Sequence, residues 1–273
     1  MRMLFDIGGT TTRIAFSADG KTISEPRVLL TPATFKEGVN IFKDIAKNQP
    51  ITKAAGGIAG LLDNKKTTLT HSPHLLQWIH KPIQDELEKA LNAPVYLEND
   101  AVMEGLGELH YGAGKGSDIF TFLTVGTGVG GARFVNGKAD ASAMGFEPGK
   151  QILSFSEKKT LEDLISGSAL EKRMGKKPGQ ITDAKIWEEL AEMLAYGLYN
   201  SIVHWSPDTV ALGGSMIVKE VGINIERVLF HLANIPRPFP QLPEIKLAQL
   251  GDNAGFLGSL HFLNTYSCKV NPY

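Results

Sequence analysis

Cysteine is almost missing from this chain of 273 residues. Cys268 is the single cysteine, so the chain cannot form an internal disulfide or a zinc site built from several thiolates. Such sparing use of cysteine is typical of a reducing compartment. We therefore expect a cytoplasmic protein.

The sequence also lacks an excess of charge of either sign. Lys and Arg number 28 against 29 Asp and Glu, which leaves a formal net charge of -1. A chain without a basic field has little attraction for phosphate backbones or anionic lipid. We expect no nucleic-acid partner and no membrane partner.

Long hydrophobic runs are absent as well. The longest apolar stretches, such as residues 119–125, fall well short of the roughly 20 residues that span a bilayer. Asp6 interrupts the apolar start of the chain before a signal-peptide core could form. With 42% hydrophobic and 21% charged residues, the composition is that of a soluble globular protein with one large domain or two of ordinary size.

Two segments of the sequence repeat the same pattern. Residues 4–21 and 122–138 each contain a short apolar run, a glycine- and threonine-rich turn, a second run and a tight turn. The tight turns, Asp19-Gly20 and Asn136-Gly137, are typical of two-residue hairpins, whose central residues need positive φ. The repeat predicts two related lobes, each opening with antiparallel strands.

The remaining periodicity predicts alternating helices and strands, which is typical of an α/β fold. Three glycines within residues 111–116 indicate a hinge between the lobes, and the proline-dense segment 235–240 favours a loop over a ligand for a partner. The predicted helices cover residues 35–48, 81–91, 101–110, 161–173, 183–204 and 254–264, and the predicted strands cover 53–58, 95–97 and 209–212.

The glycine turns admit several interpretations. Residues 126–131 fit the dinucleotide pattern G-x-G-x-x-G, but a strand rather than a helix is expected to follow, which excludes that interpretation. A relaxed P-loop pattern at residues 15–22 lacks its first glycine, and Pro26 comes too soon for a helix. Residues 8–12 and 126–131 remain as paired turns whose N–H groups and hydroxyls can bind phosphates, or whose glycines merely serve tight turns.

Other polar positions follow predicted strands. Asp6 lies inside an apolar strand, where it can serve a Mg²⁺ ion or face water at the strand end. Asp100 follows strand 95–97, where it can cap the next helix or act catalytically. Gly213-Gly214 follows strand 209–212 and should precede a helix; it can admit a flat ligand or simply turn the chain.

With these residues assembled, the sequence resembles sugar kinases of the ROK family, within the sugar kinase, actin and Hsp70 ATPase superfamily, over nearly its whole length. Residues 6–13 and 126–131 resemble the two phosphate motifs, and Glu98-Asn99-Asp100 resembles the catalytic segment. The resemblance implies an α/β fold with two related lobes of the actin-like ATPase (ribonuclease H-like) type and a cleft between them. The lobes would be residues 1–115, joined by a C-terminal helix at 255–273, and residues 116–254.

The resemblance also implies an activity, the ATP-dependent phosphorylation of a hexose at its 6-hydroxyl, with glucose favoured. An N-acetylhexosamine kinase, acting for example on N-acetylmannosamine, and a non-catalytic sugar sensor remain alternatives, and polyphosphate remains an alternative donor. Asp6 lies so near the first residue that we expect no DNA-binding module before it. A homodimer is a possible assembly in this family.

The implied site residues fall into groups. Asp100 is the base, Asn99, Glu147 and Glu162 bind the sugar, and Asp6 holds Mg²⁺ through water. ATP is bound by Gly8, Gly9, Thr10, Thr11, Gly126, Thr127, Gly128, Gly213 and Gly214.

The chain departs from the family pattern on the sugar side. Lys150 stands where the family has a histidine that touches sugar hydroxyls and metal, so we count Lys150 among the sugar-binding residues and leave the sugar open. No cysteine-rich loop follows it, and we expect no zinc. Glu162 has a second interpretation, as an exposed glutamate favoured by the dipole of its helix.

Overall fold

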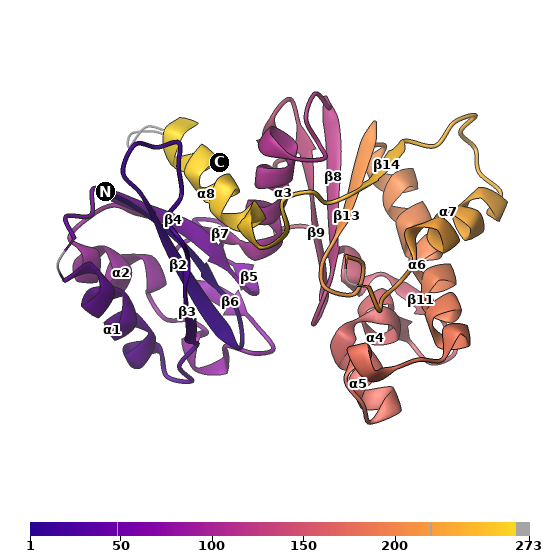
Figure 1. Cartoon of the computed structure of the whole chain (residues 1–273), viewed down its shortest axis with the longest axis horizontal. Helices are drawn as coiled ribbons and strands as arrows, with labels where there is room; N and C mark the ends of the chain where they lie inside the picture. Colours follow the sequence, from indigo (N-terminus) through magenta and orange to yellow (C-terminus); the bar gives the residue numbers. More distant parts are fainter. Residues whose placement is uncertain (48, 219, 266–273) are drawn as a thin grey trace. The chain divides into compact units, whose positions relative to one another are not determined.

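The computed structural model describes residues 1–47, 49–218 and 220–265. The chain forms two compact units, whose elements can be followed in Figure 1 by colours that run from the N-terminus to the C-terminus. Unit 1 comprises Met1–His110, Ala141–Gly145 and residues 252–265, and unit 2 comprises Tyr111–Asp140 and Phe146–Gly251. The lobe boundaries expected at 115 and 254 stay predictions. Of the C-terminal helix expected at 255–273, residues 266–273 lie outside the described residues.

Unit 1 is built on a mixed sheet of five strands in the order β3-β2-β1-β4-β7. The first three strands are antiparallel, and β1, β4 and β7 are parallel. Phe5 packs edge-on against Phe42 of α1, with ring centroids 5.3 Å apart, while Leu4 and Asp6 point to the opposite face because side chains alternate along a strand. The strands are β1 (Arg2–Ile7), β2 (Thr11–Ser17), β3 (Arg27–Leu30), β4 (Lys53–Ile58) and β7 (Val95–Asn99).

Helices cover both faces of this sheet. The core on the Phe5 face joins the strands to α1 and α2, while α8 contacts β1 and β4 on the other face and packs closely against α3 (Figure 1). The helices are α1 (Phe35–Ala46), α2 (Ile83–Leu91), α3 (Asp100–Tyr111) and α8 (Ala254–Thr265). α8 therefore brings the last described part of the chain onto the sheet formed by the first part.

Unit 2 repeats the arrangement with the order β10-β9-β8-β13-β14. Three strands are again antiparallel, and β8, β13 and β14 are parallel. The long helix α6 lies against the buried strand β13 and contacts α7 and α4. The elements are β8 (Ile119–Val125), β9 (Val129–Val135), β10 (Lys138–Ala139), α4 (Leu161–Ile165), α5 (Gly167–Met174), α6 (Ala184–Trp205), β13 (Thr209–Gly213), α7 (Ile225–Asn234) and β14 (Glu244–Leu247).

Shorter elements complete the two units. They are β5 (Leu61–Leu62), β6 (Leu69–His71), β11 (Ile152–Ser154), β12 (Lys159–Thr160) and the 3₁₀ turns Leu76–Trp78, Pro148–Lys150, Pro178–Gln180 and Gly251–Asn253. None of the described helices combines the length and the apolar character that crossing a membrane requires.

The repeated sheet order confirms the internal repeat read from the sequence, but only one of its two tight turns. Asn136 and Gly137 have φ of 52° and 79° and join β9 to β10 as predicted. The two-residue turn predicted at Asp19-Gly20 is wrong, because β2 and β3 pair antiparallel but are connected by the longer loop 18–26. Instead the Asp19 carboxylate accepts the N–H groups of Lys21 and Thr22 at 2.8 Å, so a side chain holds this turn.

Other expectations also need correction in unit 2. The helix predicted over 161–173 breaks at Ser166, whose extended backbone (ψ 156°) ends α4 while its hydroxyl caps α5. The helix expected directly after Gly214 is wrong, because turns follow there and α7 begins at Ile225. The loop predicted at 235–240 is confirmed, and the edge strand β14 follows it.

Candidate active site

The predicted residues fall into two groups, each considered within its own unit. Unit 1 contains Asp6, Asn99, Asp100 and the first glycine turn, residues 8–12. Unit 2 contains the second glycine turn, residues 126–131, together with the remaining predicted residues Glu147, Lys150, Glu162, Gly213 and Gly214.

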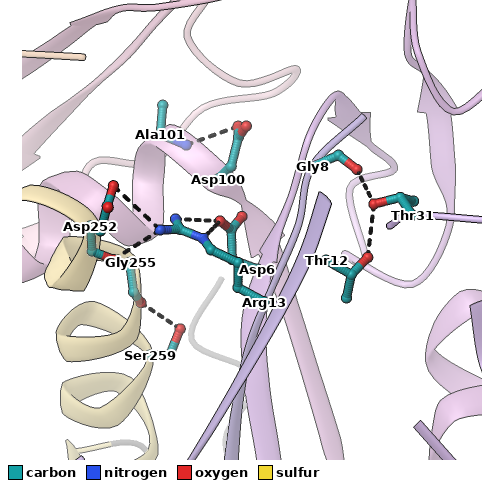
Figure 2. A network of polar contacts seen from close by, with 10 residues as sticks. All are labelled: Asp6, Gly8, Thr12, Arg13, Thr31, Asp100, Ala101, Asp252, Gly255 and Ser259. Carbon is teal, nitrogen blue, oxygen red and sulfur yellow. Dashed lines mark hydrogen bonds and ion pairs between the residues drawn. The ribbon is translucent and has the colours of Figure 1, made fainter. Parts of the chain in front are cut away.

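In unit 1, Asp6 is paired with an arginine from the neighbouring strand. The antiparallel register places Arg13 opposite Asp6, and its Nε and Nη2 donate to Asp6 Oδ2 at 2.9 and 2.6 Å (Figure 2). Arg13 is held in turn by the carbonyl of Asp252 at 3.2 Å, its carboxylate at 3.5 Å, and the ring of Phe256. Both bonds to Asp6 go to Oδ2, so Oδ1 keeps its lone pairs for another partner.

The first glycine turn is braced from inside its own sheet. Gly8 donates its N–H to the Thr11 carbonyl at 2.9 Å, and its carbonyl accepts the Thr31 hydroxyl at 2.7 Å. The buried Thr12 hydroxyl lies 2.9 Å from that of Thr31, completing the chain of contacts in Figure 2. Thr12 thus supports the turn, while Thr10 is exposed at its tip.

At the start of α3, the side chains of Asn99 and Asp100 accept different backbone N–H groups. Asn99 Oδ1 accepts the N–H of Val102 at 3.3 Å, and its amide donates to the Gly60 carbonyl at 3.1 Å. Asn99 therefore takes the capping role that was an alternative for Asp100. Asp100 Oδ1 accepts the N–H of Ala101 at 2.9 Å, and the side chain is partly exposed at the carboxyl end of β7 (Figure 2).

Three charged neighbours of these residues were missed by the sequence reasoning. Glu104 lies one helical turn after Asp100; burial first, then the charges of Asp100 and Asp6, raise its pKa to about 8. The spacing of four residues on a helix could have signalled it. Lys66 forms an ion pair at 2.9 Å with the buried Glu98, and Asp252 forms one with Arg13. Both pairs join residues far apart in the sequence, so no local sequence pattern indicates Lys66 or Asp252.

In unit 2, the second glycine turn is supported by a helix start. Gly126 donates its N–H to the Gly128 carbonyl at 2.9 Å, while Gly167 and Ser168 of α5 donate theirs to the carbonyls of Gly126 and Thr127 at 2.8 and 3.2 Å. The strand β9 begins at Val129, which confirms that this is no dinucleotide fingerprint. The exposed Thr127 lies at the tip of the turn.

The Gly213-Gly214 pair lies against the strand that leads into this turn. Gly214 has a φ of 90°, and a Cβ there would overlap the backbone of Val125. Met216 donates its N–H to the Val125 carbonyl at 2.9 Å. The structure therefore brings these glycines and the second glycine turn together within unit 2.

The predicted sugar-side residues of unit 2 also form a connected group. Lys150 Nζ lies 2.5 Å from Glu162 Oε1, and Glu162 Oε2 accepts the N–H of Val129 at 2.9 Å. Burial raises the pKa of Glu147, Lys150 opposes the shift and Glu162 adds to it. Glu162 lies in the first turn of α4, but its carboxylate is bound by neighbours rather than free in solvent.

The side chains of the predicted site limit how a metal ion could be bound. Among the described residues, no group of three or more His, Cys, Asp or Glu side chains is arranged to hold a metal ion. Mg²⁺ keeps several waters and commonly takes one or two carboxylates plus substrate phosphates, so Asp6, with one carboxylate oxygen available, fits a water-mediated role. The absence of zinc stays a prediction, and Cys268 lies outside the described residues.

Comparisons with known proteins identify the family of the chain. Residues 3–265 match the ROK family. A putative fructokinase from Bacillus subtilis is 29% identical, covering 75% of this chain and 76% of the relative. A glucokinase from Thermotoga maritima is 29% identical over 60% of this chain and 57% of its own. The crystal structure of a ROK glucokinase from Streptomyces griseus with glucose and AMPPNP is 23% identical, covers 97% of this chain and 99% of that one, and has a TM-score of 0.76.

The fold and the repeated glycine turns thus define an α/β protein with two related units, as predicted, and each unit is built on a mixed sheet of five strands. The chain belongs to the ROK family, as one of its sugar kinases.

Proposed function

We propose that this enzyme transfers the γ-phosphate of ATP to the 6-hydroxyl of a hexose, with glucose the favoured acceptor. The observation that carries the proposal is that Asn99, and not Asp100, caps the start of α3. Asn99 caps the helix, so capping is not the role of the Asp100 carboxylate, which lies at the carboxyl end of a parallel strand. Such strand ends are where α/β proteins place catalytic groups.

In the proposed reaction Asp100 accepts the proton of the 6-hydroxyl. The oxygen of that hydroxyl forms a bond to the γ-phosphorus, the bond from phosphorus to the β,γ-bridging oxygen breaks, and ADP leaves. A positioned base contributes roughly 10² to 10⁴-fold to the rate. Alignment and charge neutralisation contribute more, because phosphoryl transfer asks the protein mainly for positioning.

The two glycine turns bind the phosphates in this proposal. Backbone N–H groups and the exposed hydroxyls of Thr10 and Thr127 act as donors that add no fixed charge. Thr11, Gly9 and Gly128 complete the turns, and Gly213 and Gly214 form the adenosine side. Asp6 orients a water of a Mg²⁺ ion, whose charge, when bound, neutralises the phosphates.

Sugar hydroxyls are bound by Asn99, Glu147, Glu162 and Lys150 in the proposal. The carboxylates accept from hydroxyls, and the Lys150 ammonium donates where a histidine is usual in the family. ATP and glucose are supported by the Streptomyces griseus structure, which holds AMPPNP and glucose. Cytoplasmic location and a homodimer stay predictions.

A matrix of donors and acceptors tests the proposal. Purified enzyme is assayed with ATP or polyphosphate against glucose, fructose, mannose, N-acetylglucosamine and N-acetylmannosamine, and products are identified by ³¹P and ¹³C NMR. We expect the highest kcat/KM for ATP with glucose and phosphate on the 6-oxygen. A higher value for N-acetylmannosamine would replace the sugar, and no turnover with any pair would favour a non-catalytic sensor.

A further inference from the structure

Glu162 connects two parts of unit 2 that were predicted to serve different substrates. One carboxylate oxygen, Oε1, faces Lys150 of the sugar-side segment, residues 147–150. The other, Oε2, accepts the Val129 N–H at the end of the second glycine turn. A single carboxylate therefore spans from the predicted sugar side to the predicted phosphate side.

The fit around Oε2 is close. A Cβ at Gly128 would lie 2.7 Å from this oxygen, so the glycine leaves the room that the carboxylate occupies. The charged acceptor also strengthens the hydrogen bond from Val129 relative to a neutral one. The conformation of the turn at Gly128 and Val129 thus depends on where the Glu162 side chain lies.

A second contact links the same two parts independently. A Cβ at Gly149 would overlap the Val129 carbonyl, so the sugar-side segment packs directly on the residue that Glu162 binds. Lys150 also donates its backbone N–H to the Glu147 carbonyl at 3.0 Å, which holds the segment in a tight turn. The N–H and the carbonyl of Val129 are therefore both approached from the sugar side.

We propose that Lys150 and Glu162 act as a positioning pair that couples sugar binding to nucleotide binding through Val129. Lys150 holds Glu162 on the turn, Glu162 fixes the Val129 N–H, and a sugar engaging Lys150 and Glu147 changes how firmly the turn is held. The inference rests on the proposed function. If instead Glu162 and Lys150 only touch sugar, neither affects nucleotide binding in the absence of sugar.

The pair is tested by measuring nucleotide binding calorimetrically with and without glucose. The probes are ADP and AMPPNP, and the variants are Lys150→Met, which removes the cation, and Lys150→Arg, which keeps it. Lys159→Met is the matched control because Lys159 forms an ion pair with Glu157 on the exposed surface of a nearby hairpin. Coupling between ligands is commonly worth roughly 5- to 150-fold in affinity.

We expect glucose to change the nucleotide Kd of the wild type by about fivefold or more, the low end of that range. Lys150→Met should weaken nucleotide binding without sugar and abolish the effect of glucose, whereas Lys150→Arg restores it and Lys159→Met leaves both unchanged. The Val129 amide resonance in ¹H–¹⁵N spectra should shift in Lys150→Met and in Glu162→Gln, but not in Lys159→Met. If Lys150→Met does not fold, Glu162→Gln replaces it in the calorimetry, with the same loss of coupling expected.

An unchanged nucleotide Kd without sugar in Lys150→Met, or in Glu162→Gln in its place, overturns the inference whether or not the glucose effect persists, and it leaves the proposed function standing. Failure of the wild type to bind ADP or AMPPNP overturns both. The two failures are therefore distinguishable.

Discussion

The two glycine turns follow equivalent strands of equivalent sheets, yet they are supported in different ways. The first is held by the hydroxyls of Thr12 and Thr31, which belong to or adjoin its own sheet. The second is held by Glu162 and by the start of α5, which lie more than 30 residues further along the chain. A fold can thus repeat its strand order without repeating its supports. Because Glu162 supports the second glycine turn, a ligand that binds near Glu162 can change the conformation of that turn.

The largest expected effect is in unit 1, which contains the proposed base Asp100. Asp100→Asn should lower kcat by about 10² to 10⁴-fold, because the amide cannot accept the proton of the attacking hydroxyl. Steady-state kinetics and calorimetric sugar binding measure the effect, and the sugar Kd should change little. Asp85→Asn, an exposed carboxylate on α2, is the control. Retention of more than a tenth of the rate would remove Asp100 from this role.

The next effect compares one glycine from each turn. A Cβ at Gly9 would overlap the Cβ of His74, which lies next to the backbone and cannot swing aside, whereas a Cβ at Gly128 meets the movable end of Glu162. Gly9→Ala should therefore cost about 1–3 kcal/mol of unfolding free energy, as overpacking does. Gly128→Ala should cost less and act mainly on nucleotide KM. Urea denaturation of both variants tests the order, and an equal or reversed cost contradicts it.

The next effect concerns pH and unit 1, and it is smaller per pH unit than the cost of Gly9→Ala. The pKa of Glu104 is about 8 in the folded state against an ordinary 4.5, so between these values the folded protein binds more protons than the unfolded one. The free energy of unfolding should therefore fall as pH rises through this window, by at most about 1.4 kcal/mol per pH unit. Glu104→Gln should flatten this dependence and exceed the wild type in stability at pH 8.

Urea denaturation at pH 5, 6.5 and 8 measures this dependence. Glu192→Gln, an exposed position on α6, should follow the wild type at each pH. A Glu104→Gln variant whose stability changes with pH as steeply as that of the wild type would show that Glu104 is not the group responsible.

The smallest expected effect concerns the hydroxyl support of the first turn. Thr12→Val keeps the shape of the side chain but removes its hydrogen bond to Thr31, which should cost about 1 kcal/mol of unfolding free energy. Thr22→Val, which removes an exposed hydroxyl bond to Asp19, should cost less. Thermal unfolding of the two variants compares them, and a larger loss in Thr22→Val would contradict the support assigned to Thr12.

Much of the fold could be predicted because it depends on local pattern. Strand β4 matches its predicted range at both ends, since a run of small and apolar residues between turns has few alternatives. The break between α4 and α5 was not predictable in this way. Ser166 interrupts a helical pattern so that Gly167 can reach the Gly126 carbonyl, a contact that exists only after folding.

The site residues likewise include some that local pattern indicates and others that depend on contacts formed on folding. Asp100 and Asn99 could be singled out because they follow a strand and resemble a family segment, although their roles stay predictions. Glu104 and Arg13 gain their importance from side chains on other elements, as the sharing of Arg13 between Asp6 and Asp252 shows. Sequence patterns contain little information on contacts between charged residues that lie far apart in the sequence.

The return of the chain through Asp252 to α8 has a consequence for synthesis on the ribosome. Unit 2 is complete once Gly251 has emerged, whereas unit 1 still lacks the helix that covers one face of its sheet and the Asp252 carbonyl that binds Arg13. During translation unit 2 can therefore fold first, whereas unit 1 can be completed only after residues 252–265 have been synthesised.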